Sequence, residues 1–535
     1  MRRPDQLLPI HPAAWLPLVL VVALGAVIAV GFWGFSYDDA FITYRYAERM
    51  AAGEGLTYNP GEWVLGTSAP GFAVLLAALS WLGRPLGWGA PQWGSVVGVF
   101  SIGAVCLLPV LAAPRGDGGR RLAAEAAVVS TCAAVLSLTL RWHVELLGAE
   151  ALPVIALIGA AALVARSGRH DVVAGLLVAL AATMRLDALL GGGALGAALW
   201  GHRRRLPVAY AAAALLPVVA WLGMLWLAFD SVLPTTLAAK QSELAADGPS
   251  YAFAQWRWLT RTMPLSSTIA LACLAAAGVA ELIRRRLWRD PVPLAIAGWV
   301  LALEVFYRMA AVPFAPWYHL PTVATLVLLA AFGAAALGRA VARPVAARRE
   351  RADATMAPIV ALLLVVPVLA PALAWLGSTW REPPDPRYAI YRQVGEHLRA
   401  ASGREGDQGR AAAVEIGVLG YFSRRPILDL VGLVSPQSRA ARAEGRQAAL
   451  LLQAPPEVIV DVPLFHREYP VLTDPEIRAL YAEDAAFEDP PSGRGRVVVR
   501  RLRERSAPGP GLAGSWWSPL PNERRDRSAV IPRAR

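Results

Sequence analysis

The feature that most restricts the fold is a series of long apolar runs separated by clusters of arginine. A helix of about 20 apolar residues is needed to cross the roughly 30 Å hydrocarbon layer of a membrane. Runs of about this length recur from the N-terminal region to about residue 378. The whole chain is 56% apolar and only 17% charged, a balance typical of multi-span membrane proteins. The net charge of +12 lies largely in arginine clusters between these runs, which indicates cytoplasmic loops and not a nucleic-acid partner.

Placing the arginine clusters on the cytoplasmic side predicts eleven spans in the plasma membrane, with the N-terminus inside and the C-terminal region outside. The first run lacks a small-residue cleavage site after it, so we interpret it as a retained span. Residues 70–83 are apolar but short, which favours an interfacial helix. The spans are expected at about 13–33, 92–113, 121–140, 146–165, 206–228, 266–283, 291–307, 318–338 and 356–377, with two short passes within 171–200.

The two short passes meet at a polar hinge, Met184-Arg185-Leu186-Asp187. About 14 residues of helix rise only about 21 Å. Short or broken helices at membrane depth are tolerated where they line a cavity. This hinge therefore predicts a cavity at or just below the outer surface.

From about residue 378 the chain becomes charged, with alternating apolar patterns. The fold class predicted is a multi-span α-helical membrane protein with a C-terminal extracytoplasmic mixed α/β domain. We expect a transmembrane catalytic domain over 1–378, with 31–91 as an outer loop. The α/β domain should cover 379–504, and a disordered tail 505–535. Strands are expected within 411–422, 424–434, 456–463 and 495–502, and helices at 388–401 and 435–454.

Two adjacent carboxylates, Asp38 and Asp39, follow the first apolar run. The pattern predicts a polar, aromatic-rich helix over about 37–52. Ser36 and Asp39 fit a capping box, so helix capping is one interpretation of the acids. Capping needs only one acid, however, and ionisable groups at membrane depth mark functional sites. We therefore predict that Asp38 and Asp39 are catalytic, as a general base or a clamp for a divalent metal ion.

Other polar residues gather at the outer ends of the expected spans, and we predict that they bind substrate. Glu150 and Asp187 can instead form structural pairs with Arg185, whose planar guanidinium also suits phosphate oxygens. The substrate-binding candidates are Arg45, Glu150, Arg185, Asp187, Lys240, Tyr318 and His319.

The remaining candidates also have structural alternatives. Arg45 can pair with Asp38, bind a lipid phosphate or simply meet headgroups. Lys240, the single lysine among 52 Lys+Arg, can bind a phosphate or be a solvated loop cation. His319 can bind a leaving phosphate, or it can anchor the chain at the membrane interface together with Tyr318.

With these residues in view, the chain resembles the GT-C glycosyltransferases, and most of all arabinofuranosyltransferase-like members from mycolate-type cell walls. The resemblance rests on the acid pair followed by a tyrosine-rich helix, residues 38–47, and on the turn Gly55-Leu56-Thr57-Tyr58-Asn59-Pro60-Gly61-Glu62. Similarity reaches to about residue 465. Weaker elements are Gly148-Ala149-Glu150, Arg185-Leu186-Asp187 without the usual proline, Leu233-Pro234-Thr235-Thr236 through Lys240, Glu415-Ile416-Gly417 and Asp429-Leu430-Val431-Gly432-Leu433.

The resemblance implies that a sugar, arabinofuranose or mannose, moves from a polyprenyl-phosphate donor in the membrane lipid to a cell-envelope glycan, glycolipid or protein acceptor. Asp38 would activate the acceptor hydroxyl, and Asp39 would orient the acceptor or a divalent metal ion. Lys240, Arg185 and His319 would hold the leaving phosphate. The alternative is a flippase or transporter of lipid-linked sugars, because outer-face charges around short helices also suit a substrate vestibule. The sequence has neither a GxxxxGK[ST] loop nor an HExxH motif.

Overall fold

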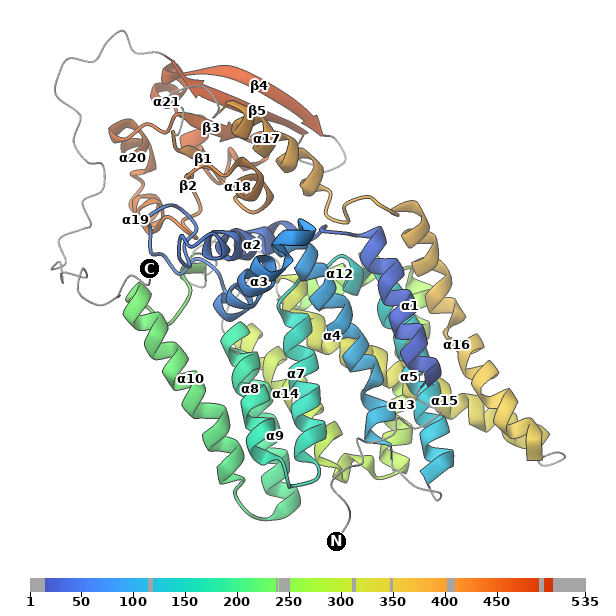
Figure 1. The fold of residues 1–535 in the computed structure, drawn as a ribbon. Coiled ribbons are helices and arrows are strands. Elements are labelled where there is room, and N and C mark those ends of the chain that lie inside the picture. The colour runs from blue at the N-terminus through green and yellow to red at the C-terminus, as the bar shows by residue number, and fades with distance from the viewer. Residues whose placement is uncertain are drawn as a thin grey trace.

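The computed structural model describes residues 15–113, 119–236, 239, 251–309, 314–346, 350–401, 409–489 and 495–503. Figure 1 shows three levels: an upright bundle of helices, two helices lying across its upper end, and an α/β domain above them. The expected tail over 505–535 lies outside the described residues. The chain is thus a multi-pass membrane protein with a C-terminal α/β domain, which confirms the expected fold class.

A helix lies at each of the eleven expected spans. Within the described ranges, seven of them are long and apolar enough to cross a membrane, and α1, α7 and α8 are shorter apolar helices. The helices are α1 (Trp15–Gly31), α4 (Ala90–Ala112), α5 (Arg120–Thr139), α7 (Ala151–Ala165), α8 (Asp171–Met184), α9 (Ala188–Arg203), α10 (Val208–Phe229), α13 (Leu265–Arg284), α14 (Pro291–Met309), α15 (Leu320–Ala346) and α16 (Glu350–Ser378).

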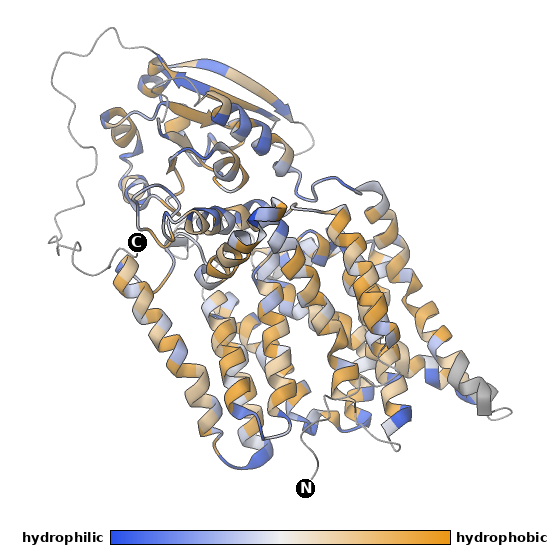
Figure 2. Cartoon of the chain, in the orientation of Figure 1, coloured by the Kyte–Doolittle hydropathy of each residue, from blue (hydrophilic) through white to orange (hydrophobic). Residues whose placement is uncertain are grey.

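The arginine-bearing ends of several helices meet at the lower end of the bundle. Arg285 after α13 and Arg339 in α15 both pair with Glu125 of α5, at 2.8 and 2.6 Å. Figure 2 shows hydrophilic residues at this end and in the α/β domain, whereas the bundle between them is apolar. The common location of these arginines agrees with the alternation used to place the spans. Which side of the membrane they face stays a prediction.

Helices α2 (Asp38–Ala51) and α3 (Pro70–Gly83) lie between the bundle and the domain (Figure 1). The predicted polar helix after the first span is therefore present. The predicted capping box is wrong, because Tyr37 is the N-cap residue and no side chain caps the helix. The Ser36 hydroxyl instead donates to the carbonyl of Leu147 at 2.6 Å, which ties the corner before α2 to the segment before α7.

Short helices complete the membrane part. The hinge of the two short passes is confirmed, because α8 ends at Met184 and α9 begins at Ala188. The remaining elements are η2 (Arg84–Leu86), α6 (Arg141–Val144), α12 (Tyr251–Thr262), η4 (Leu287–Arg289) and η5 (Pro316–His319).

The α/β domain is built on a five-stranded sheet with the order β2-β1-β3-β5-β4. The first three strands in this order are parallel, and β5 pairs antiparallel with both β3 and β4. The strands are β1 (Ala411–Ala413), β2 (Ile427–Asp429), β3 (Val458–Asp461), β4 (Tyr481–Asp489) and β5 (Gly495–Leu502). The helices are α17 (Arg387–Ala401), α18 (Val418–Ser423), α19 (Pro436–Ala443), α20 (Gln447–Gln453) and α21 (Pro475–Leu480), with η6 (Pro463–Phe465) and η7 (Pro470–Leu472).

The sequence predicted α17, β3 and β5 correctly, and the other elements only in part. The strand expected within 411–422 stops at Ala413, and α18 takes its second half. The helix expected over 435–454 is broken at Gly445, which adopts a φ of 68°. The sequence does not predict strand β4. This strand lies at the edge of the sheet and carries Glu483, Asp484 and Glu488, so it lacks the apolar alternation by which a strand is recognised.

Candidate functional site

The two adjacent carboxylates of α2 point into different surroundings. Successive residues of an α-helix are about 100° apart around its axis, so two neighbouring side chains leave the helix in different directions. Asp39 lines a small cavity between α2 and the ends of the bundle helices. Asp38 is 3% exposed and lies against the α/β domain. The acid pair is therefore divided between two sites.

The cavity beside Asp39 has a volume of about 30 Å3, enough for one or two water molecules. Its polar lining combines two carboxylates, of Asp39 and Glu150, with several hydroxyl groups. Tyr37 and Trp317 form one wall, with stacked rings whose centroids are 4.7 Å apart. The other lining residues are Ile42, Thr43, Gly66, Thr67, Ser68, Thr236 and Leu433.

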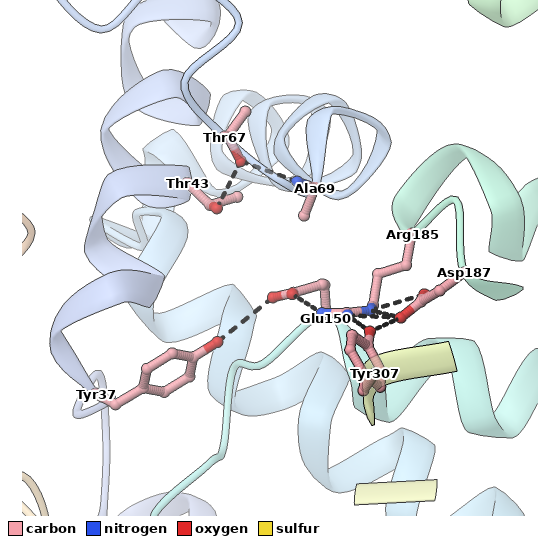
Figure 3. Close-up of polar contacts among 8 residues, drawn as sticks. All are labelled: Tyr37, Thr43, Thr67, Ala69, Glu150, Arg185, Asp187 and Tyr307. Atoms are coloured by element: carbon pink, nitrogen blue, oxygen red, sulfur yellow. Dashed lines mark hydrogen bonds and ion pairs between the residues drawn. The ribbon is translucent and has the colours of Figure 1, made fainter. Parts of the chain in front are cut away.

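Hydroxyl groups of this cavity are held in place by one another and by backbone groups. The side-chain oxygens of Thr43 and Thr67 are 2.9 Å apart, and Thr67 also accepts from the amide of Ala69 (Figure 3). The hydroxyl of Tyr37 points to the carboxylate of Glu150, at 3.4 Å. Such fixed donors and acceptors can contact hydroxyl groups of a ligand that reaches the edge of this small cavity.

Glu150 is joined to the hinge between α8 and α9 by Arg185 (Figure 3). Arg185 donates to Glu150 at 2.6 Å, to Asp187 at 2.7 Å and to the hydroxyl of Tyr307 at 2.8 Å. Tyr307 also donates to Asp187. Two carboxylates therefore neutralise the single guanidinium. The structural pairing that was the alternative for Glu150, Arg185 and Asp187 is present.

Tyr318 and His319 are adjacent in the chain but contact different groups of residues. Tyr318 stacks on Tyr307 at 4.5 Å and lies 5.4 Å from the guanidinium carbon of Arg185, so it belongs to the hinge cluster. His319 is buried, with its Nδ1 3.0 Å from the carboxylate of Glu304. It does not line the cavity beside Asp39.

Asp38 lies among groups of the α/β domain. Its carboxylate accepts from the amide of Val418 at 2.9 Å, and its own amide donates to Asp385 at 3.0 Å. Arg387 pairs with Asp385 at 2.7 Å and with Glu415 at 2.9 Å. Burial raises the pKa of Asp38 from 3.8 to about 7; Arg387 opposes this rise, and Glu415 adds to it.

Glycine at position 417 permits this close approach. A Cβ on Gly417 would lie 2.0 Å from the carbonyl oxygen of Asp38, a distance at which the backbone has to move. The element Glu415-Ile416-Gly417, which supported the resemblance, thus provides the contact between the domain and the first turn of α2.

Arg45 also belongs to the domain junction, which differs from the substrate contact expected for it. Its guanidinium donates to the carbonyl of Tyr58 at 2.9 Å, to that of Arg425 at 2.6 Å and to that of Gly420. Arg45 is 4% exposed. Its role in this structure is to fasten α2 to helix α18 and the segment after it.

The turn after α2, on which the resemblance also rested, docks onto the sheet of the domain. Asn59 donates to the carbonyl of Ile427 at 2.8 Å and accepts from the amide of the same residue at 2.9 Å. Its side-chain amide thereby pairs with strand β2 as a neighbouring strand would. Glu62 accepts from Asn59 at 2.9 Å and pairs with Arg410 before β1. This turn therefore positions the domain, and it does not line the cavity.

The domain contributes one wall of the cavity through the loop after β2. Asp429 accepts from the amides of Val431 and Val434, at 2.9 and 3.0 Å, and so shapes this loop. The carbonyl of Leu433 then accepts from the hydroxyl of Thr235, in the loop after α10. The sequence could not identify this contact, because the residues are 198 positions apart.

Lys240 lies outside the described residues, and its predicted phosphate contact stays a prediction. In the described part of the chain, no group of three or more His, Cys, Asp or Glu side chains gathers as a metal site. Of the residues that the structure describes, Asp39 and Glu150 provide the carboxylates of the cavity. Metal binding by Asp39 therefore also stays a prediction.

Two solved structures of a different protein share this architecture. The crystal structure of ArnT from Cupriavidus metallidurans bound to undecaprenyl phosphate has a TM-score of 0.53 and 15% identity, over 93% of this chain and all (100%) of ArnT. The apo form has a TM-score of 0.56 and 14% identity, over 91% of this chain and 98% of ArnT. The chain has the ArnT fold. At this identity the likeness concerns the fold alone.

Comparisons of sequence cover less of the chain. A family described as "Domain of unknown function (DUF8728)" matches residues 382–502, the part that forms the α/β domain. The comparison with curated proteins gives no match.

Proposed function

We propose that the chain is a membrane glycosyltransferase that moves a sugar from a polyprenyl-phosphate donor to a hydroxyl group of a cell-envelope glycan, glycolipid or protein. The observation that carries the proposal is the cavity in which Asp39, Glu150 and fixed hydroxyl groups meet between the bundle and the α/β domain. The ArnT structure with the same fold holds undecaprenyl phosphate, a lipid of the class that the donor would release. The proposal places this site on the outer face.

Asp39 is the better candidate for the acid that accepts the proton of the attacking hydroxyl. A general base has to come within hydrogen-bond reach of that proton, so it has to be accessible to the acceptor. Asp39 lines the cavity, whereas Asp38 is covered by Val418 and Asp385. The sequence analysis predicted that Asp38 activates the acceptor; we propose instead that Asp38 is a positioning residue, which fixes the start of α2 and hence the direction of Asp39.

The proposed transfer is a single displacement at the sugar. The acceptor O–H bond breaks, and its proton passes to the carboxylate of Asp39. The acceptor oxygen bonds to the anomeric carbon, while the bond from that carbon to the phosphate oxygen breaks. The phosphate leaves with the electron pair and gains negative charge, which a nearby cation would stabilise. Asp39 is regenerated when its proton returns to water.

Lys240 remains the proposed cation for the leaving phosphate. Arg185 is less suited to that task, because Glu150 and Asp187 already neutralise its charge. We assign Arg185, Glu150 and Asp187 to positioning. Their ion pairs keep Glu150 at the cavity and fix the hinge between α8 and α9. Trp317, stacked on Tyr37, offers an apolar face against which a sugar ring can pack.

The test compares neighbouring acids in the full-length protein reconstituted in lipid. Radiolabelled polyprenyl-phosphate arabinofuranose and mannose would be supplied with membrane glycan acceptors. Asp39→Asn removes the proposed base, and Asp230→Asn, a change of the same chemistry at the end of α10, is the matched control. We expect label in glycan with the wild type and the control, but not with Asp39→Asn. Label that crosses the bilayer on its lipid and forms no glycan would overturn the proposal and favour a flippase.

A further inference from the structure

A second and much larger hollow, of about 690 Å3, lies between helices α2, α17 and α18 and the segment from η2 to the start of α4. This volume is in the range of sites for small organic ligands, about 300–1,000 Å3. Neither Asp38 nor Asp39 lines it. We call it the arginine groove. It is separate from the cavity of the proposed transfer reaction, and ligand binding in the groove does not depend on that reaction.

Four arginines line the arginine groove: Arg84 from η2, Arg392 and Arg399 from α17, and Arg424 after α18. The two on α17 are seven residues apart, two helical turns, and so share one face of the helix. Planar guanidinium groups from several directions suit the oxygens of a phosphate group.

Acidic groups that line the arginine groove do not balance these cations. Among the described residues the acidic one is Glu48, and it already accepts from the amide of Ala90 at 2.6 Å. Arg392 pairs with Glu396 at 2.8 Å, but these side chains are 47% and 50% exposed. An ion pair as exposed as this contributes little, so Arg392 can exchange it for a ligand.

The floor of the arginine groove lies where two bundle helices end. Helix α1 ends at Gly31 and α4 begins at Ala90, and Trp33 and Trp88 between them stack edge to face at 4.8 Å. Trp81 and Leu82, at the end of α3 and two to three residues before Arg84 in the chain, are 59% and 62% exposed. Tryptophan is enriched at the interface between lipid and water, which indicates that the groove opens at this level. A free phosphate ion would make no use of these exposed apolar side chains.

We propose that the arginine groove binds the phosphate headgroup of an anionic membrane lipid, whose acyl chains lie along Trp81 and Leu82. Arg84 belongs to the membrane part, whereas Arg392, Arg399 and Arg424 belong to the α/β domain. One headgroup can therefore bridge the two parts. Bound lipid would hold the domain against the bundle on the side of α2 away from Asp39.

The proposal is tested with the full-length protein in a neutral detergent, by native mass spectrometry. Dioctanoyl phosphatidylglycerol is the probe, dioctanoyl phosphatidylcholine the zwitterionic comparison and inorganic phosphate the competitor. We expect the anionic lipid to bind and phosphatidylcholine not to bind. Since basic residues near an anionic surface each strengthen binding by about fivefold, Arg392→Gln/Arg399→Gln should bind phosphatidylglycerol about 30-fold more weakly.

Matched variants separate this site from general attraction to a basic protein. Arg446→Gln/Arg496→Gln removes the same charge from side chains that are 69% and 49% exposed elsewhere on the domain, and it should bind like the wild type. Arg392→Lys/Arg399→Lys keeps the charge and should retain most of the binding. If the glutamine pair does not fold, Arg399→Gln alone should weaken binding about fivefold.

Three outcomes would overturn the proposal. Equal binding of both lipids would mean that the headgroup charge is not recognised. Equal weakening in the control pair would mean that no particular site is involved. Full competition by inorganic phosphate at the same concentration as the lipid would identify a site for free phosphate, at which the apolar side chains have no role.

Discussion

Two faces of the short helix α2 bear similar residues but have different surroundings: one packs against the α/β domain, and the other lines a cavity. The face with Asp38, Phe41, Arg45 and Glu48 packs against the α/β domain. Phe41 lies 5.3 Å from the ring of Tyr421, and Arg45 donates to backbone carbonyls. Every polar group named on this face contacts protein. Its charges serve to hold the two parts of the molecule together.

The face with Asp39, Ile42 and Thr43 lines the small cavity instead. Its polar neighbours are hydroxyl groups and Glu150, which can exchange partners with a ligand. The difference shows that buried charge alone does not identify a reactive group. What separates Asp39 from Asp38 is access, since both acids occupy the first turn of one helix.

The largest effect on the rate of sugar transfer should come from substituting Asp39, compared with the same substitution of Asp38. Asp39→Asn should lower the rate of sugar transfer by roughly 10²–10⁴-fold, the usual contribution of a general base. Asp38→Asn keeps an oxygen for the amide of Val418 and should change the rate by less than about tenfold. Single-turnover rates with labelled donor measure both. The opposite order of effects would return the role of base to Asp38.

The next effect concerns the charges that fix the cavity. Arg185→Gln leaves the buried carboxylates of Glu150 and Asp187 without their cation, which should lower the free energy of unfolding by roughly 3–5 kcal/mol. Arg141→Gln also removes a cation from a carboxylate, Glu145, but its side chain is 36% exposed. That control should cost less than about 1 kcal/mol. Thermal unfolding in lipid compares the two, and equal losses would contradict the structural role of Arg185.

The docking turn can be tested with a nearly isosteric change. Asn59→Asp replaces the donor to Ile427 by a carboxylate oxygen, so a backbone carbonyl loses its partner and faces a negative charge. We expect a loss of roughly 1–3 kcal/mol, observed as faster proteolysis between α16 and α17. Gln453→Glu, the same chemical change on an exposed side chain of α20, should have no such effect. Undisturbed cleavage in Asn59→Asp would show that the turn does not hold the domain.

The last prediction concerns how the free energy of unfolding depends on pH through Asp38, which lies against the α/β domain. Its effect is small for each unit of pH. The pKa of Asp38 rises from 3.8 to about 7 on folding, so the folded protein binds the extra proton between these values. Stability should therefore fall as pH rises through this window, by at most about 1.4 kcal/mol per pH unit, and level off above it. Unfolding measured at pH 5.5 and 6.5 should show this slope in the wild type and a smaller one in Asp38→Asn. Equal slopes would mean that Asp38 does not titrate there.

The sequence predicts those parts of the molecule whose causes are local. Apolar runs and arginine clusters predict the helices of the bundle, and the polar interruption at 184–187 predicts the hinge between α8 and α9. Strand β4 escapes because a charged edge strand carries no apolar alternation. The sequence also does not predict that Asp38 and Asp39 have different surroundings, and the reason is different. These surroundings depend on which element covers each face of α2, and those elements come from the far end of the chain.

The contacts of Arg45 have a consequence for the order in which the molecule is made. Two of its three acceptors, the carbonyls of Gly420 and Arg425, are 375 and 380 residues further along the chain. At roughly 5–20 residues per second, the ribosome needs roughly 20–75 s to reach them after α2 has emerged. Through this interval a charged side chain that ends up buried has to stay hydrated beside the membrane. A domain that is synthesised about 375 residues later thus completes the burial of a side chain on α2.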